Sequence, residues 1–159
     1  MTPLILFHTA LSLFAIGAGV VFTYRMLAGK LTGTWTHLYL ATTLGTSYSG
    51  LVIPVTKILP SHIFAVLSIL VLAVSVRAFY TKQLAGGWKK IYIATTLFAF
   101  YLNVFVLVVQ SFMKIPALKV LAPTQSEPPF AIAQSLVLFT FIGIGYLALK
   151  RAAKMQVVA

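Results

Sequence analysis

Five apolar runs divide the sequence, and each is long enough to cross the hydrocarbon core of a bilayer as one helix. A helix rises about 1.5 Å per residue, so about 20 residues span roughly 30 Å of hydrocarbon. None of the runs contains an acidic residue, and none alternates with the period of two that a β-barrel requires. The sequence therefore predicts an all-α integral membrane protein, a single five-helix transmembrane bundle with helices over Pro3–Tyr24, Thr36–Val55, Ser61–Tyr80, Ile91–Met113 and Pro129–Leu149.

The scarcity of charge supports this fold class. Charged residues make up 8% of the 159 residues and hydrophobic residues 60%, whereas a soluble domain carries about 25% charged residues. We therefore expect the lipid bilayer to be the main partner of the chain. The sequence contains no cysteine, which excludes disulfides, thiolate nucleophiles and thiolate metal sites.

The positive charges mark the orientation. Twelve Lys and Arg residues stand against a single acid, Glu127, a balance that in a soluble protein suggests nucleic-acid binding. Here the cations lie between the apolar runs, and no RNA-binding motif accompanies them, so we expect no nucleic-acid partner. Three cations, Lys57, Lys114 and Lys119, fall on one side of the predicted bundle. The other nine predict an external N-terminus and a cytoplasmic C-terminus: Arg25, Lys30, Arg77, Lys82, Lys89, Lys90, Lys150, Arg151 and Lys154.

An internal repeat relates the first four runs. Leu31–Leu44 and Leu84–Leu97 share eight of fourteen residues at an offset of 53, and Arg25 matches Arg77 at an offset of 52. The repeat predicts two parallel hairpins related by an axis along the membrane normal. We expect the first run, as the counterpart of the third, to be retained rather than cleaved as a signal peptide. The predicted segments are hairpins at 3–56 and 61–113, a loop at 114–128, a fifth helix at 129–149 and a basic tail at 150–159.

Two further local features have structural interpretations. Two small-residue ladders on the second run, Ala41–Gly45–Ser49 and Thr42–Thr46–Gly50, predict a face for close helix packing. The loop Lys114–Pro128 contains three prolines, which predicts an ordered loop rather than another helix, either a connector or a functional segment.

Four aromatic residues flank the predicted cytoplasmic ends of the second and fourth helices and are typical of interfacial anchors, with ligand stacking as a minor alternative: Trp35, Tyr39, Trp88 and Tyr92.

Polar residues inside the membrane are costly and mark either packing contacts or function. Asn103 lies near the centre of its predicted helix, and Gln110 follows seven residues later on the same face. His8 and Gln134 enter their helices at a similar depth, with Ser47 and Ser49 nearby and Glu127 in the loop above. These depths predict an outward-facing polar pocket formed by His8, Asn103, Gln110, Glu127 and Gln134. The alternative is that each amide pairs locally with a neighbouring helix.

The histidines raise a cofactor hypothesis. His8 and His62 are equivalent within the repeat, so they are the pair that would hold a b-type haem between facing helices. His62 lies shallower than His8, and His37 lies at the opposite interface. We expect no other metal site and no catalytic residue, because the sequence contains no G-x-S-x-G, HExxH or P-loop motif and no intramembrane carboxylate.

The order of residues in the first hairpin carries a resemblance. It runs through His8, Gly17, Gly19, Arg25, Gly29, Lys30, Trp35, His37, Tyr39 and Gly50. This order resembles a broad group of bacterial predicted membrane proteins without a settled activity, in which a helix beginning with His leads through a short basic turn to a helix of H-x-x-x-G-x-x-Y type. The resemblance covers residues 8–50 and departs from the pattern at Leu38, where the group has Arg. It implies a bacterial inner (cytoplasmic) membrane and slightly favours a cytochrome-like function.

Three functions are compatible with these patterns. We expect a non-enzymatic protein that binds or passes a small or lipophilic molecule through the polar pocket. The first alternative is a b-type haem electron-transfer protein. The second is a structural or accessory subunit that packs against copies of itself or against a partner in a membrane complex.

Overall fold

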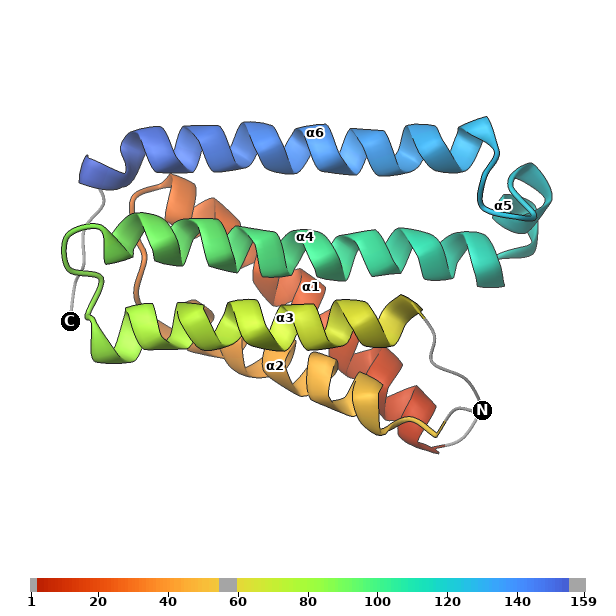
Figure 1. Cartoon of the computed structure of the whole chain (residues 1–159), viewed down its shortest axis with the longest axis horizontal. Coiled ribbons are helices and arrows are strands. Elements are labelled where there is room, and N and C mark those ends of the chain that lie inside the picture. The colour runs from red at the N-terminus through yellow and green to blue at the C-terminus, as the bar shows by residue number, and fades with distance from the viewer. Residues whose placement is uncertain (1–2, 55–59, 155–159) are drawn as a thin grey trace.

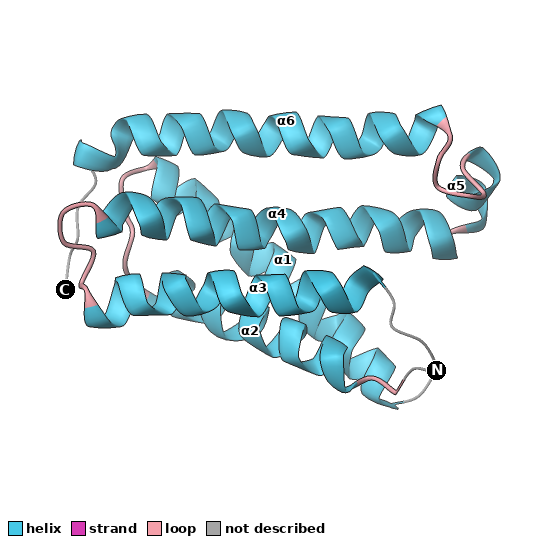
Figure 2. Ribbon diagram, viewed as in Figure 1, coloured by secondary structure: helices cyan, strands magenta, loops and turns pink. Residues whose placement is uncertain are grey.

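The computed structural model describes residues 3–54 and 60–154, and every regular element in this part of the chain is helical (Figure 2). Three elements are short: a π-helix at Arg77–Thr81, α5 at Pro116–Leu121 and a 3-10 helix at Ala152–Lys154. The five long helices are α1 (Pro3–Leu27), α2 (Thr34–Val52), α3 (Pro60–Val76), α4 (Trp88–Lys114) and α6 (Pro128–Arg151).

Helix α4 is the centre of the arrangement, because it contacts each of the other four long helices. Helices α3, α4 and α6 run alongside one another in Figure 1, while α1 crosses behind them at an angle and packs chiefly on α2. Helix α2 is held between α1 and α3. The apolar runs thus associate as one bundle rather than as separate hairpins.

The two ends of the bundle differ in charge. Nine cations, named above, lie at one end of the bundle, which we call the basic end. This end is formed by the end of α1, the start of α2, the end of α3, the start of α4 and the end of α6. The opposite end carries Lys114 and Lys119, and Lys57 lies outside the described residues. The single acid, Glu127, also lies at that opposite end, directly before α6.

Four described helical segments are long and apolar enough to cross a membrane: Pro3–Leu27, Ser61–Thr81, Trp88–Lys114 and Pro128–Lys154. The prediction of an all-helical membrane protein is confirmed at this level. Helix α2 is not among the four because it carries many hydroxyl groups. Several of these bond back to carbonyls of their own helix, such as Thr42 Oγ1 to Leu38 O at 2.6 Å. A fifth crossing stays a prediction.

A layer of buried aromatic side chains fills the half of the bundle near the basic end. We call Phe22, Tyr39, Tyr92 and Phe100 the aromatic layer. Phe22 and Tyr39 stack with their ring centroids 4.8 Å apart, and Tyr39 Oη donates to the Thr96 carbonyl at 2.7 Å. This half of the bundle is therefore closely packed.

The prediction of four interfacial anchors is wrong for two of them. Tyr39 and Tyr92 are 0% exposed, whereas Trp35 is 38% exposed at the first turn of α2. The Tyr39 ring can be buried because its hydroxyl finds an acceptor inside the bundle. Trp88 stays at the basic end, where Arg77 and Lys82 lie 5.8 and 5.6 Å from its ring centroid.

Several residues that match across the predicted repeat are alike in burial. Three pairs are buried at both positions: Leu31 and Leu84, Tyr39 and Tyr92, and Thr43 and Thr96. The turn glycines of the two segments, Gly33 and Gly86, both have positive φ, 118° and 53°. These pairs are alike in burial, and the repeat itself stays a prediction.

The prediction that Lys114–Pro128 contains no helix is wrong, because α5 occupies Pro116–Leu121. Pro116 stands at the first position of this helix, where its fixed φ is favourable and its missing N–H costs nothing. The same preference places Pro128 at the start of α6. A proline-rich loop can therefore begin a helix as well as end one.

Candidate functional site

A cavity of about 620 Å³ lies between α1, α2, α3 and α4 in the half of the bundle away from the basic end. Its wall is mostly apolar, with Ile5, Leu13, Phe64, Leu102 and Met113 among its lining residues. The polar lining residues come from all four helices and the adjoining turns: His8, Thr9, Ser12, Thr46, Ser47, Ser61, His62, Ser68, Asn103, Gln110, Ser111 and Lys114.

Three of the five residues predicted to form a pocket line this cavity, namely His8, Asn103 and Gln110. Asn103 and Gln110 lie on the same face of α4, as their seven-residue spacing predicts. His62 also lines the cavity, so both histidines of the predicted haem pair border one space. Gln134 and Glu127 are not among the lining residues.

His8 is oriented by α2. Its Nδ1 lies 2.9 Å from Ser49 Oγ, and Ser49 Oγ donates to the Thr46 carbonyl at 3.1 Å. With the Ser49 proton on the Thr46 carbonyl, Ser49 Oγ accepts a hydrogen bond from His8 Nδ1–H. In this tautomer Nε2 is the ring nitrogen that keeps a lone pair.

A glycine on α2 makes room for the His8 ring. A Cβ atom at Gly50 would lie 3.1 Å from His8 Cε1, closer than ordinary van der Waals contact. Five residues earlier, a Cβ at Gly45 would lie 3.2 Å from Leu11 Cδ2. The close approach of α1 to α2 at these positions is the contact that the small-residue ladders predict.

Asn103 presents a donor to the cavity. It lies eleven residues before the end of α4, so about 16 Å into the bundle at 1.5 Å per residue. Its Nδ2 atom is buried and has no hydrogen-bond partner among the described residues. Nearer the mouth, the Gln110 amide also makes no hydrogen bond to another described residue. The cavity wall therefore offers hydrogen-bonding groups that the protein itself leaves unused.

Serine hydroxyls in the cavity wall make hydrogen bonds between helices and within them. Ser47 Oγ donates to Ser68 Oγ at 3.0 Å across the contact between α2 and α3. On α1, Ser12 Oγ donates to the His8 carbonyl at 2.7 Å. Ser68 and Ser12 were not expected from the sequence, because a lone serine in an apolar run gives no sign of the direction it faces. Their position in the cavity wall follows from the arrangement of the helices.

Gln134 pairs locally instead of facing the cavity. Its Nε2 donates to the Phe105 carbonyl at 3.2 Å, which joins α6 to α4. Gln134 thus pairs with a neighbouring helix, as the alternative interpretation of the membrane amides predicts, and it does not line the cavity.

Glu127 organises the turn before α6. Its carboxylate accepts hydrogen bonds from Thr124 N at 3.1 Å, Thr124 Oγ1 at 2.9 Å and Ser126 N at 3.1 Å. Partial desolvation acts to raise the pKa of Glu127, but these hydrogen bonds outweigh it and hold that pKa below its ordinary value. Close by, Gln125 Nε2 donates to the Val109 carbonyl at 2.9 Å and fixes the loop to α4.

The cavity ends where the aromatic layer begins. Its deepest lining residues on α1 and α4 are Ile16 and Leu102. Beyond them, Gly19 meets Phe100 so closely that a Cβ at Gly19 would lie 2.6 Å from the ring. The side chains that follow toward the basic end are buried in one contiguous core. The cavity therefore does not continue to the basic end.

No protein-family model, no curated protein and no solved structure matches this chain.

Proposed function

We propose that the protein binds a small lipophilic molecule with an oxygen-containing head group in the cavity between α1, α2, α3 and α4. The observation that carries this proposal is the buried, unpaired Nδ2 of Asn103 on a mostly apolar wall. Cavities of this size with apolar walls and a few convergent polar groups are typical of small-molecule sites.

The energetic argument concerns the amide proton. An amide donor removed from water without a partner costs on the order of 2–7 kcal/mol. The unpaired Thr46 hydroxyl in the same wall can rotate to a carbonyl of its own helix, as Thr42 does. The Asn103 amide carries two protons at a fixed site and needs an acceptor from outside its helix. A carbonyl oxygen on a bound molecule would satisfy it.

His8 supplies the complementary group. With its Nδ1–H donated to Ser49, its Nε2 would accept a hydrogen bond from a hydroxyl or amide of the bound molecule. The donor, Asn103, and the acceptor, His8, lie at different depths in the bundle. His8 is five residues from the start of α1, whereas Asn103 is eleven residues from the end of α4. The favoured ligand class is an uncharged lipophile with a carbonyl group at its inserted end.

Binding is favoured over passage by the aromatic layer. Phe22, Tyr39, Tyr92 and Phe100 fill the other half of the bundle. A molecule crossing from one end to the other would have to separate the Phe22–Tyr39 stack and break the bond from Tyr39 to Thr96.

Our proposal includes the finer topology. The chain forms a five-crossing bundle of two parallel hairpins and a fifth helix in a bacterial inner membrane, with the cavity facing outward and the basic end in the cytoplasm. Its support is the segregation of cations to one end, the matched burial across the repeat, and the position of α2 between α1 and α3. An outward-facing cavity would receive its ligand from outside the cell or from the outer leaflet.

The test compares two amide-to-leucine variants. Purified protein in nanodiscs is titrated with 2-undecanone and, separately, with undecane, which has the same chain without the carbonyl. We expect the wild-type protein to bind the ketone more tightly, and Asn103→Leu to abolish that preference. Gln134→Leu is the matched control, since Gln134 bonds to Phe105 outside the cavity. Equal affinity of the wild type for both ligands, or equal loss in both variants, would refute the proposal.

A b-type haem is the second candidate, favoured because His8 and His62 line the same cavity. In the Nδ1–H tautomer, His8 Nε2 has the lone pair that an axial ligand needs. An absorption spectrum of protein expressed with adequate haem decides this: a Soret band lost in His8→Ala and in His62→Ala supports it. A spectrum without that band excludes it.

A further inference from the structure

The connection between α4 and α6 exposes large apolar side chains. Val120 is 80% exposed and Leu121 is 54% exposed, and Val120 is the most exposed large hydrophobic residue that the structure describes. Both belong to α5, in which no residue is buried. Single exposed apolar residues are ordinary, but adjacent ones at the end of a bundle indicate a surface that another molecule covers.

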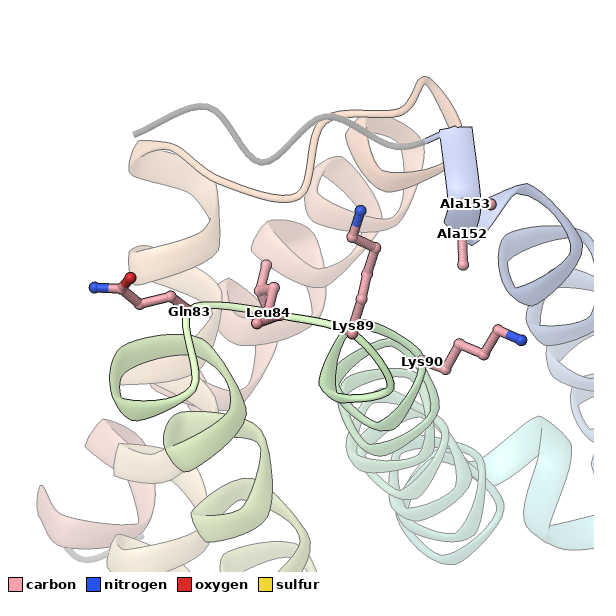
Figure 3. A pocket seen from close by; sticks show the side chains of 8 residues that line it. Gln83, Leu84, Lys89, Lys90, Ala152 and Ala153 are labelled. Atoms are coloured by element: carbon pink, nitrogen blue, oxygen red, sulfur yellow. The ribbon is translucent and has the colours of Figure 1, made fainter.

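The connection at the basic end is built differently. Residues 82–87 join the π-helix to α4 beside a hollow of about 450 Å³ (Figure 3). The large apolar residue of this connection, Leu84, is 2% exposed, while the polar side chains of Gln83 and Lys90 extend away from the ribbon in Figure 3. This arrangement is typical of a segment in contact with water. The connection between α4 and α6 instead exposes both of the apolar residues that end α5.

The exposed apolar residues of α5 share one face. Ala117, Val120 and Leu121 are three and four residues apart, which places them on the same side of a helix. Lys119 points away from that face, because successive residues are about 100° apart around the helix axis. Over its six residues, α5 is therefore amphipathic.

The stability of α5 requires a partner for this face. Isolated helices shorter than about 12–15 residues are marginal in water, and helices in proteins are stabilised mainly by packing an amphipathic face. The connection is tied to α4 by Ile115 N, which donates to the Ser111 carbonyl at 2.9 Å, and by Gln125 Nε2, which donates to the Val109 carbonyl at 2.9 Å. These bonds position α5 and leave all six of its residues unburied. The packing partner of the apolar face therefore lies outside the described part of the chain.

The length of α4 sets the level of α5 in a bilayer. Lys90 and Lys114 are 24 residues apart, about 36 Å along the helix at 1.5 Å per residue. The hydrocarbon core is about 30 Å thick, and the bilayer with its head groups about 40–45 Å. In a bilayer, the two lysines thus reach the two head-group layers. Helix α5 begins two residues after Lys114, so it lies in the layer opposite the basic end.

We propose that α5 lies in the bilayer interface, with Val120 and Leu121 inserted among the acyl chains and Lys119 directed to phosphate groups and water. Lipid is the partner because α5 joins Trp88–Lys114 to Pro128–Lys154, two segments that are each long and apolar enough to cross a membrane. Basic and apolar residues on opposite faces are typical of interfacial helices. The proposal depends on the crossing of α4 and α6, and not on the cavity or on α2.

Spin labels test the depth of each residue. Because the sequence contains no cysteine, the single variants Ala117→Cys, Lys119→Cys, Val120→Cys and Leu121→Cys each carry one nitroxide on the full chain in phosphatidylcholine nanodiscs. Relaxation by molecular oxygen, which concentrates in hydrocarbon, is compared with relaxation by a water-soluble nickel chelate. We expect oxygen to dominate at positions 117, 120 and 121, and the chelate to dominate at position 119.

The control is Ala85→Cys, an exposed position in the connection at the basic end, where the chelate should dominate. Dominance of the chelate at positions 120 and 121 would overturn the proposal, because the face would then be in water. Low accessibility to both reagents at these two positions would also overturn it, because a protein surface would then cover the face. Circular dichroism verifies that every labelled variant keeps the helix content of the wild type.

Discussion

At the scale of single residues, the imidazole of His8 depends on the residue that faces it being glycine. Gly50→Ala would place a Cβ 3.1 Å from His8 Cε1 and push the ring away from Ser49. We expect a several-fold loss of 2-undecanone binding with little change in helix content. Gly45→Ala is the control on the same helix, since its Cβ would meet Leu11 at 3.2 Å. An equal loss in both variants would mean that helix spacing, and not the His8 ring, governs binding.

Glu127 should give the turn before α6 a pH dependence. Its pKa in the folded protein is below the ordinary value, so the turn is stabilised above that ordinary value. This stabilisation is lost as the pH falls through the lowered pKa. Titrating the amide NMR shifts of Thr124 and Ser126 from about pH 6 to pH 2 should show a midpoint below that of a free glutamate. The transition should vanish in Glu127→Gln, and a midpoint above the ordinary value would contradict the hydrogen bonding described.

The candidate site shows what can be predicted residue by residue. Depth along a helix follows from counting, so His8, Asn103 and Gln110 could be placed at the cavity from the sequence. Direction around the helix axis does not follow from counting when an apolar run has no polar face. Gln134 has a suitable depth yet bonds to Phe105, because α6 turns that residue toward α4.

At the scale of the helices, two glycines of α1 offer a matched comparison. A Cβ at Gly19 would lie 2.6 Å from the Phe100 ring, whereas a Cβ at Gly17 would meet no atom within 4 Å. Gly19→Ala should therefore force α1 and α4 apart at an overpacking cost of about 1–3 kcal/mol. Gly17→Ala should leave thermal stability in detergent unchanged or slightly raised. Similar melting temperatures for the two variants would show that the contact between α1 and α4 yields without cost.

The helices also show where sequence patterns succeed. The long apolar runs predict α1, α3, α4 and α6 because a helix satisfies every backbone group within the segment, and the runs lack the alternation of barrel strands. The pattern is weaker for α2, whose hydroxyl groups reduce its apolar character although they bond within the helix. The prediction of an anchor is wrong for Tyr39 because the acceptor of its hydroxyl, the Thr96 carbonyl, lies 57 residues away in the sequence.

At the scale of the whole molecule, the absence of cysteine allows a direct test of orientation. Single variants Lys30→Cys, Lys90→Cys and Lys119→Cys are expressed in intact cells and exposed to a membrane-impermeant maleimide. We expect labelling of position 119 from outside, and labelling of positions 30 and 90 only after permeabilisation. Because α3 is long and apolar enough to cross, positions 30 and 90 share a side only if α2 crosses as well. Labelling of these two positions from opposite sides would therefore exclude five crossings. Labelling of 30 and 90 in intact cells would reverse the orientation.

The π-helix at Arg77–Thr81 has a consequence for the history of the chain. Arg25 and Leu31 are six residues apart, whereas their counterparts Arg77 and Leu84 are seven apart, and the extra residue lies where the π-helix is. A π-turn is an α-turn with one residue added. If the two hairpins descend from one ancestor, an insertion entered the second copy after duplication. The helix absorbed it as a wider turn, and Leu84 kept the buried position that Leu31 holds in the first copy.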